Sequence, residues 1–286
     1  MSYITQLRQS SEHTGNCVCM GLDVQLPLLP HHSGDLTKDI THFYEELFSE
    51  MVKEDLIPSA FKPNIGYFHA LDKPTEYTFS GSIALAKTLE LLKTYFSSIP
   101  IILDSKRGDI ARSSENYATE AFKIWGSDAV TVSPYMGSDS IHPFGNDKGV
   151  YVLTKTSNPG SNDLQNILTQ EHNPFFMETA KMIVSFSHTM KGIGSVVGAT
   201  HIKELQMIAS FFAPHDIPLL IPGVGSQGGD AKSIIQTLKD LNYDLRLVRI
   251  NSSSALTHPW KNSPPPKNWK EVCISSIRSL ISECSL

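Results

Sequence analysis

The sequence predicts an α/β fold, a (β/α)8 TIM barrel that forms a single domain over residues 1–286. Eight short apolar runs alternate with helical patterns along the chain. The runs are apolar at successive positions, which is typical of parallel strands buried on both faces. Eight strand–helix units in about 250 residues match a closed barrel. A doubly wound open sheet is the alternative, but it favours fewer units and an early glycine-rich turn.

The expected strands are short runs of mainly β-branched and aliphatic residues. They are 17–23, 59–63, 99–103, 129–132, 150–154, 195–199, 218–222 and 245–250. Between them, apolar residues recur at three- and four-residue spacing, which indicates helices. The helices are expected within 40–51, 85–96, 110–125, 177–184, 202–209, 231–241 and 269–281, with a short one near 139–144.

Composition excludes several functional classes. The chain is 40% hydrophobic and has a formal net charge of -5. At this length and hydrophobic content, a sizeable core can form without disulfide bonds or a structural metal. Mild acidity gives no electrostatic case for nucleic acid or for an anionic membrane. We expect no signal peptide, and no apolar stretch reaches membrane-spanning length. The four cysteines form no C-x-x-C pair, so we expect reduced, buried thiols and a cytoplasmic protein.

The segment from Asp104 to Asp109 places charged residues where the third strand ends. Side chains on a strand repeat their direction every second residue, so Asp104 and Lys106 are expected on one face. Gly108 lets the chain turn, and Asp109 opens the next helix. The structural alternative is a strand-end salt bridge or a helix cap at Asp109, because ion-pair networks also occur without catalysis.

A barrel brings the carboxyl ends of its strands together at one mouth, where active sites lie. The polar strand-end residues expected there are Asp23, Lys62, Asp104, Lys106, Asp109 and Ser157. Alternating lysines and carboxylates keep one another charged and supply fixed electrostatics plus a proton donor. Taken singly, Lys62 fits an ordinary surface lysine and Asp23 a capping residue.

The turn from Pro222 to Gly229 follows the seventh strand and is rich in glycine. Barrels often bind phosphate at the loops after strands seven and eight. Backbone N–H groups freed by glycine suit a phosphate, although such a turn alone is more often only a loop. The eleven histidines are scattered, mostly in polar loops such as His31–His32, and their spacing indicates no metal site.

With these residues in place, the sequence resembles the orotidine 5'-phosphate decarboxylase family over nearly its whole length. The family signature Asp-x-Lys-x-x-Asp is present as residues 104–109. The segments 21–23 and 61–64 are similar to the family's first and second strand ends. The segments 156–160, 197–200 and 222–225 are similar to those of its longer, type 2-like branch. The resemblance is specific because several motifs match in order.

The resemblance implies decarboxylation of orotidine 5'-monophosphate to UMP without metal or cofactor. Lys106 would protonate C6, Asp104 would sit against the departing carboxylate, and Lys62 would complete the charge array. Asp109 would reach in from the partner subunit of a homodimer.

For substrate binding, the resemblance implies that Asp23 and Lys62 hold ribose hydroxyls and that Ser157 reads the pyrimidine edge. Gln227 and the amides of Gly228 and Gly229, in the turn that starts at Pro222, would close over the phosphate.

One position departs from the family pattern. The family has an arginine just after strand eight that grips the phosphate, and Ser254 stands there instead. Loss of a charged phosphate contact costs about 1.5 to 3 kcal/mol. Arg249, earlier on the same strand, is the candidate substitute if its side chain reaches the mouth.

Two other functions stay open. A related sugar-phosphate lyase or decarboxylase would hold a divalent metal at Asp104 and Asp109, although the flanking lysines oppose a cation. A non-catalytic nucleotide-binding protein is suggested by Ser254, but the complete charge array is against it.

Overall fold

Eight parallel strands form a barrel in the part of the chain that the computed structural model describes, residues 1–145, 147–225, 228–261 and 263–286. The strands are β1 (Val18–Leu22), β2 (Ala60–Pro63), β3 (Ile102–Arg107), β4 (Ala129–Val132), β5 (Gly149–Lys155), β6 (Ile193–Val197), β7 (Leu219–Pro222) and β8 (Val248–Ser252). Their order is β2-β1-β8-β7-β6-β5-β4-β3. Parallel bridges between Phe61 and Ile101 and between Asn64 and Asp104 close the ring. The predicted barrel is confirmed.

The strands are apolar at successive positions because both of their faces are covered. Every residue of β1, β2, β4, β6 and β8 is buried. Side chains such as Cys19, Ile102, Tyr151 and Leu220 fill the barrel interior. The opposite faces pack on the surrounding helices.

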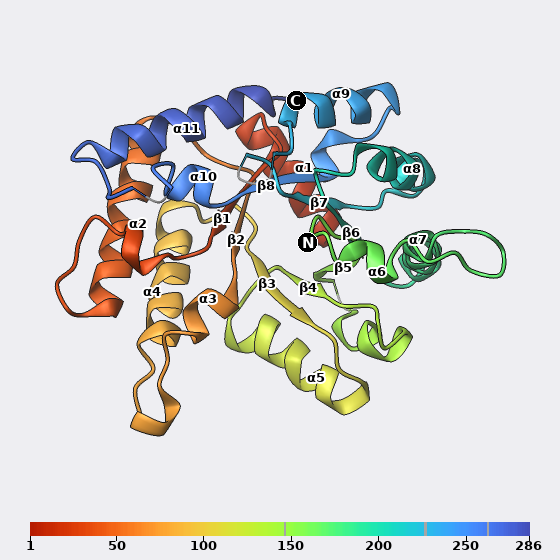
Figure 1. The fold of residues 1–286 in the computed structure, drawn as a ribbon, viewed down its shortest axis with the longest axis horizontal. Helices are drawn as coiled ribbons and strands as arrows, with labels where there is room; N and C mark the ends of the chain where they lie inside the picture. Colours follow the sequence, from red (N-terminus) through yellow and green to blue (C-terminus); the bar gives the residue numbers. More distant parts are fainter. Residues whose placement is uncertain (146, 226–227, 262) are drawn as a thin grey trace.

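Helices surround the strands (Figure 1). They are α2 (Leu36–Lys53), α3 (Ile65–His69), α4 (Ser80–Tyr95), α5 (Ala111–Thr119), α6 (Ser161–Leu164), α7 (Phe175–Ser187), α8 (Ile202–Phe212), α9 (Ala231–Asp240), α10 (Ser254–Thr257) and α11 (Trp269–Glu283). The longer ones are amphipathic: α2, for example, buries Ile40, Phe43, Leu47 and Met51 at three- and four-residue spacing.

An additional helix, α1 (Tyr3–Thr14), packs over the amino end of the barrel and was not predicted. The Ser2 side chain accepts the Thr5 N–H and caps the helix. The Tyr3 hydroxyl donates to the Tyr151 hydroxyl inside the barrel. The helix therefore closes the end of the barrel opposite to the mouth.

Several element boundaries differ from the expected ones, and three of these differences have a clear structural description. β8 begins at Val248 rather than Leu245, because Asp244 accepts the N–H and guanidinium of Arg246 and folds 245–247 into a 3-10 turn. β3 begins at Ile102 and runs on into the charged residues. The segment expected as a short helix near 139–144 is two 3-10 turns, Ser138–Ser140 and His142–Phe144.

Two predictions from composition can be compared with the fold. All four cysteines are free and buried. Among the described residues, none of the helices combines the length and the apolar character needed to cross a lipid bilayer.

Candidate active site

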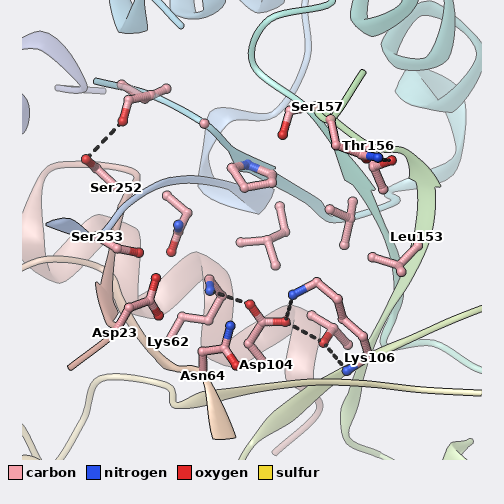
Figure 2. Close-up of a pocket in the computed structure, with 18 of the residues that line it drawn as sticks. Asp23, Lys62, Asn64, Asp104, Lys106, Leu153, Thr156, Ser157, Ser252 and Ser253 are labelled. Atoms are coloured by element: carbon pink, nitrogen blue, oxygen red, sulfur yellow. Dashed lines mark hydrogen bonds and ion pairs between the residues drawn. The ribbon is translucent and has the colours of Figure 1, made fainter. Parts of the chain in front are cut away.

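A cavity of about 600 Å³ opens at the carboxyl ends of the strands (Figure 2). Its polar and charged lining residues are Asp23, Gln25, Lys62, Asn64, Asp104, Lys106, Thr131, Thr156, Ser157, Asn158, Gln165, Asn251, Ser252, Ser253 and Ser254. Tyr67 and apolar side chains including Leu153, Val196, Leu220 and Val224 complete the wall. The size and the mixed lining fit one small polar ligand.

Asp104 lies at the centre of the charged groups in this cavity. Lys62 Nζ donates to Asp104 Oδ2 at 2.7 Å, and Lys106 Nζ donates to Oδ1 at 2.6 Å. The side chains of Asp104 and Lys62 are 7% and 5% exposed, whereas that of Lys106 is 49% exposed. The array thus has a buried carboxylate–ammonium pair, Asp104 and Lys62, and one ammonium group, that of Lys106, that faces the open cavity.

The end of β3 is irregular, and this irregularity aims Lys106. The pairing register with β4 shifts between Leu103 and Arg107, and Lys106 adopts a φ of 47°. A non-glycine residue in this region is strained by about 1 to 3 kcal/mol. Bulges next to active sites commonly re-aim a side chain in this way.

Thr131 on β4 holds this irregular segment together. Its hydroxyl oxygen accepts the N–H groups of Ser105 and Lys106, each at 3.0 Å. The same hydroxyl donates to Asp104 Oδ1 at 2.8 Å. Thr131 was missed by sequence reasoning because it is an uncharged residue inside an apolar strand.

The two buried charges stabilise each other in their ionised forms. Burial alone would raise the pKa of Asp104, but the ammonium groups of Lys62 and Lys106 hold it well below its ordinary value. Burial would likewise lower the pKa of Lys62, yet the carboxylates of Asp104 and Asp23 raise it above its ordinary value. Asp104 is therefore a carboxylate near neutral pH.

Two charged neighbours of this array lie outside the cavity. Arg107 donates to both oxygens of Glu120, at 2.8 and 3.0 Å, and lies over the Tyr117 ring, so it is structural. Asp109 is not among the lining residues of this chain. It does not cap α5 either, since that helix begins at Ala111 after an N-cap residue, Ile110, that makes no side-chain capping bond.

Asp23 and Ser157 lie in the cavity wall, as predicted (Figure 2). Asp23 Oδ1 is buried without a hydrogen-bond partner among the described residues, and Asn251 Oδ1 is in the same state. Buried acceptors left in this way favour a ligand that supplies hydroxyl or N–H donors.

The glycine-rich turn from Pro222 to Gly229, expected to bind phosphate, lines the cavity only in part. Pro222 and Gly223 line the cavity, and Gly223 has a φ of 102°, which only glycine adopts readily. The N–H groups of Gly228 and Gly229 donate to carbonyls of the same turn, so neither amide faces the cavity. Gln227, also expected at the phosphate, lies outside the described residues.

The proposed substitute for the missing arginine is wrong. Arg249 is fully buried at the amino end of the barrel, where its guanidinium donates to Leu7 O and Ser11 Oγ. Arg249 lies on the same face of β8 as Asn251 but two residues closer to the amino end, so its guanidinium does not reach the mouth of the barrel. Ser254 does line the cavity. Lys62 and Lys106 are the two cationic residues among the described lining residues.

The chain is similar in sequence and in fold to proteins of a known family. Residues 18–244 match the family model described as Orotidine 5'-phosphate decarboxylase / HUMPS family. Orotidine 5'-phosphate decarboxylase of Albidiferax ferrireducens is 38% identical over 272 residues, covering 90% of each chain. That of Herpetosiphon aurantiacus is 36% identical over 235 residues, covering 82% of this chain and 83% of its own. The solved structure of Leishmania donovani OMP decarboxylase superimposes with a TM-score of 0.76 at 27% identity, covering 99% of both chains.

Proposed function

Because this chain belongs to the orotidine 5'-phosphate decarboxylase family, we propose that its barrel-mouth cavity binds orotidine 5'-monophosphate and that Asp104 and the flanking lysines drive loss of its carboxyl group. The protein is an orotidine 5'-phosphate decarboxylase, and its product is UMP in pyrimidine biosynthesis. Support comes from the chain of ion pairs between Lys62, Asp104 and Lys106 in the cavity.

Asp104 and Lys106 divide the chemical step between them. The substrate carboxylate lies against the Asp104 carboxylate, and the two like charges repel. When the C6–carboxyl bond breaks, CO2 leaves and the electron pair remains on C6. Lys106, whose ammonium group faces the cavity, stabilises that charge and then delivers its proton to C6.

The other residues hold the nucleotide. Lys62 and the unpartnered oxygen of Asp23 bind ribose hydroxyls, and Ser157 contacts the pyrimidine edge. Asp109 of the partner subunit completes the array in a homodimer. This assignment is supported by the absence of Asp109 from the described lining of its own chain.

The phosphate lies beside the turn that begins at Pro222 and the serines that begin α10. Because Ser254 stands in place of an arginine, backbone N–H groups and hydroxyls carry this contact. Binding energy gained at the phosphate holds the distant carboxylate beside Asp104. Use of the amides of Gly228 and Gly229 requires their two turn hydrogen bonds to open.

No metal or cofactor takes part in this proposal, because an ammonium group binds each oxygen of Asp104 and leaves neither oxygen free for a cation. The four free, buried cysteines support a reducing, cytoplasmic location.

The proposal is tested by supplying metal-stripped protein with orotidine 5'-monophosphate and excess chelator, and by measuring UMP. We expect full turnover with chelator and none on keto-sugar phosphates. Turnover that requires an added divalent metal would instead support the sugar-phosphate lyase. Binding of UMP by calorimetry without turnover would support the non-catalytic protein.

A further inference from the structure

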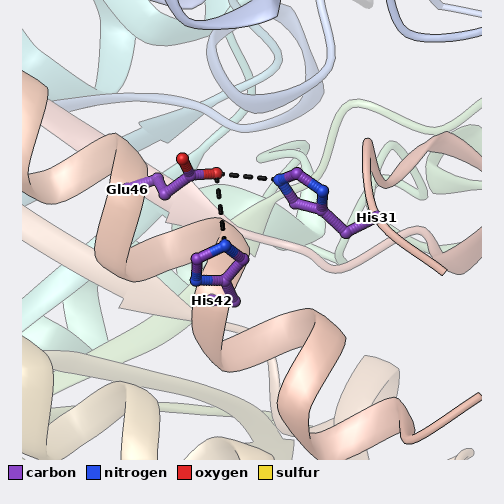
Figure 3. Close-up of side chains that lie close together, drawn as sticks. All are labelled: His31, His42 and Glu46. Carbon is purple, nitrogen blue, oxygen red and sulfur yellow. Dashed lines mark hydrogen bonds and ion pairs between the residues drawn. The ribbon is translucent and has the colours of Figure 1, made fainter. Parts of the chain in front are cut away.

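Three side chains with metal-binding donor atoms converge on the outer surface beside the middle of α2 (Figure 3). His31 comes from the loop between β1 and α2, whereas His42 and Glu46 lie one turn apart on α2. His31 Nε2 is 2.9 Å from Glu46 Oε2, and His42 Nε2 is 3.8 Å from the same oxygen. Their donor atoms all lie within 4.8 Å of one another.

The spacing of these atoms suits a tetrahedral divalent metal. Zinc binds imidazole nitrogen and carboxylate oxygen at about 2.0 to 2.2 Å, so neighbouring donors lie about 3.3 Å apart. The donor separations bracket that value, and a small rotation of the exposed His42 side chain brings its nitrogen closer to the other two donors. We propose that His31, His42 and Glu46 form a binding site for Zn²⁺ or a similar transition metal, with water as the fourth ligand.

The surroundings of Glu46 are compatible with a bound metal. Lys270 on α11 donates to the other carboxylate oxygen, Oε1, at 3.1 Å and leaves Oε2 for the ion. Outer groups that hold a ligating carboxylate in this way are a regular part of metal sites. The rings of Trp269 and His31 pack in a T-shaped arrangement with centroids 6.5 Å apart, and this contact restrains the His31 ring.

The site is separate from the cavity, because none of its three ligands is among the cavity's lining residues. A metal here would tie the loop that follows Asp23 to the body of α2. Its expected role is to order that loop rather than to take part in decarboxylation. The spacing of histidines along the chain could not indicate the site, since one ligand comes from a loop 11 positions before the next, His31 against His42.

The test is a titration of the chelator-treated protein with Co²⁺, followed by its visible absorption, and with Zn²⁺, followed by calorimetry. We expect one ion per chain, with the intense bands of tetrahedral Co²⁺. His42→Ala and Glu46→Gln should each weaken binding by about tenfold or more. His215→Ala, which changes an exposed histidine elsewhere, should bind as the wild type does.

Thermal unfolding of each variant without metal checks that the fold is intact. The proposal is overturned if the wild type binds no Co²⁺, or if the ion gives only octahedral bands. It is also overturned if His42→Ala and Glu46→Gln bind as tightly as His215→Ala, since the ion would then lie elsewhere.

Discussion

Asp104 shows how one residue organises the charges of the site. Its two oxygens accept from Lys62, Lys106 and Thr131, so the carboxylate is held in a fixed orientation. Strand alternation predicts that Asp104 and Lys106 lie together, and the structure places them in contact. Alternation could not reveal the bulge or its support by Thr131, because a neutral hydroxyl in an apolar run resembles an ordinary strand residue.

Thr131→Val is therefore expected to lower kcat by about tenfold or more, because one hydrogen bond to a charged group contributes about 1.5 to 3 kcal/mol. The N–H groups of Ser105 and Lys106 also lose their acceptor, which would leave Lys106 poorly aimed. Steady-state kinetics on orotidine 5'-monophosphate should show the loss in kcat more than in KM.

Thr131→Ser is the matched control, since it keeps the hydroxyl and loses only a methyl group. It should restore most of the activity. If valine and serine variants behave alike, Thr131 does not position the array.

His258 is expected to make stability depend on pH. Burial lowers the pKa of His258 from 6.5 to about 4. Between these two pH values, His258 is protonated in the unfolded chain but neutral in the folded chain. The free energy of unfolding therefore decreases as the pH drops from 6.5 to 4, by about 3 kcal/mol in total. His258→Phe keeps the stacking on Phe43 but has no titrating group. In this variant, the free energy of unfolding measured with urea should change much less between pH 6.5 and 4 than in the wild type. An unchanged slope would show that other groups control the acid sensitivity.

At the level of elements, the apolar runs located all eight strands, because burial on both faces leaves a continuous apolar signal. Their ends were less predictable, as the capping of residues 245–247 by Asp244 shows. Helix α1 was missed because its buried residues, Tyr3, Leu7, Ser10 and Ser11, are few and partly polar.

Close packing between β6 and the loop after β5 gives a prediction at this scale. A methyl group on Gly198 would lie 2.8 Å from Ser157 N, so alanine there would push Ser157 out of place. Gly198→Ala should raise KM for orotidine 5'-monophosphate by about tenfold or more, because small misplacements at a site are costly. Kinetics on variant protein with an unchanged unfolding temperature measures this effect. An unaltered KM would mean that Ser157 does not contact the substrate.

For the whole molecule, the barrel explains why distant segments could be assigned to one site. Parallel strands bring their carboxyl ends together, so Asp23, Lys62, Asp104 and Ser157 were expected at one mouth and lie there. The same rule does not say how deep a strand residue lies. Arg249 therefore could not be assigned from sequence to the amino end, where α1 binds its guanidinium.

The proposed sharing of the site between two subunits is tested at the scale of the assembly. A Lys106→Ala subunit retains its Asp109, and an Asp109→Ala subunit retains its Lys106. Each variant alone should be nearly inactive, whereas co-refolded mixtures should contain one complete site per mixed dimer. UMP formation should then recover to about a quarter of wild type, the statistical share of complete sites. No recovery in mixtures shown to contain mixed dimers would contradict a shared site.

The role of Lys106 as the proton donor is tested most directly by UMP formation with chelator present, comparing wild type, Lys106→Ala and Lys148→Ala. Lys148 pairs with Asp128 at the amino end of the barrel, away from the cavity. We expect Lys106→Ala to lose turnover by about a thousandfold or more while it unfolds at the wild-type temperature. Lys148→Ala should stay active. A folded Lys106→Ala protein that forms UMP at a rate comparable to the wild type would contradict the proposed catalytic centre.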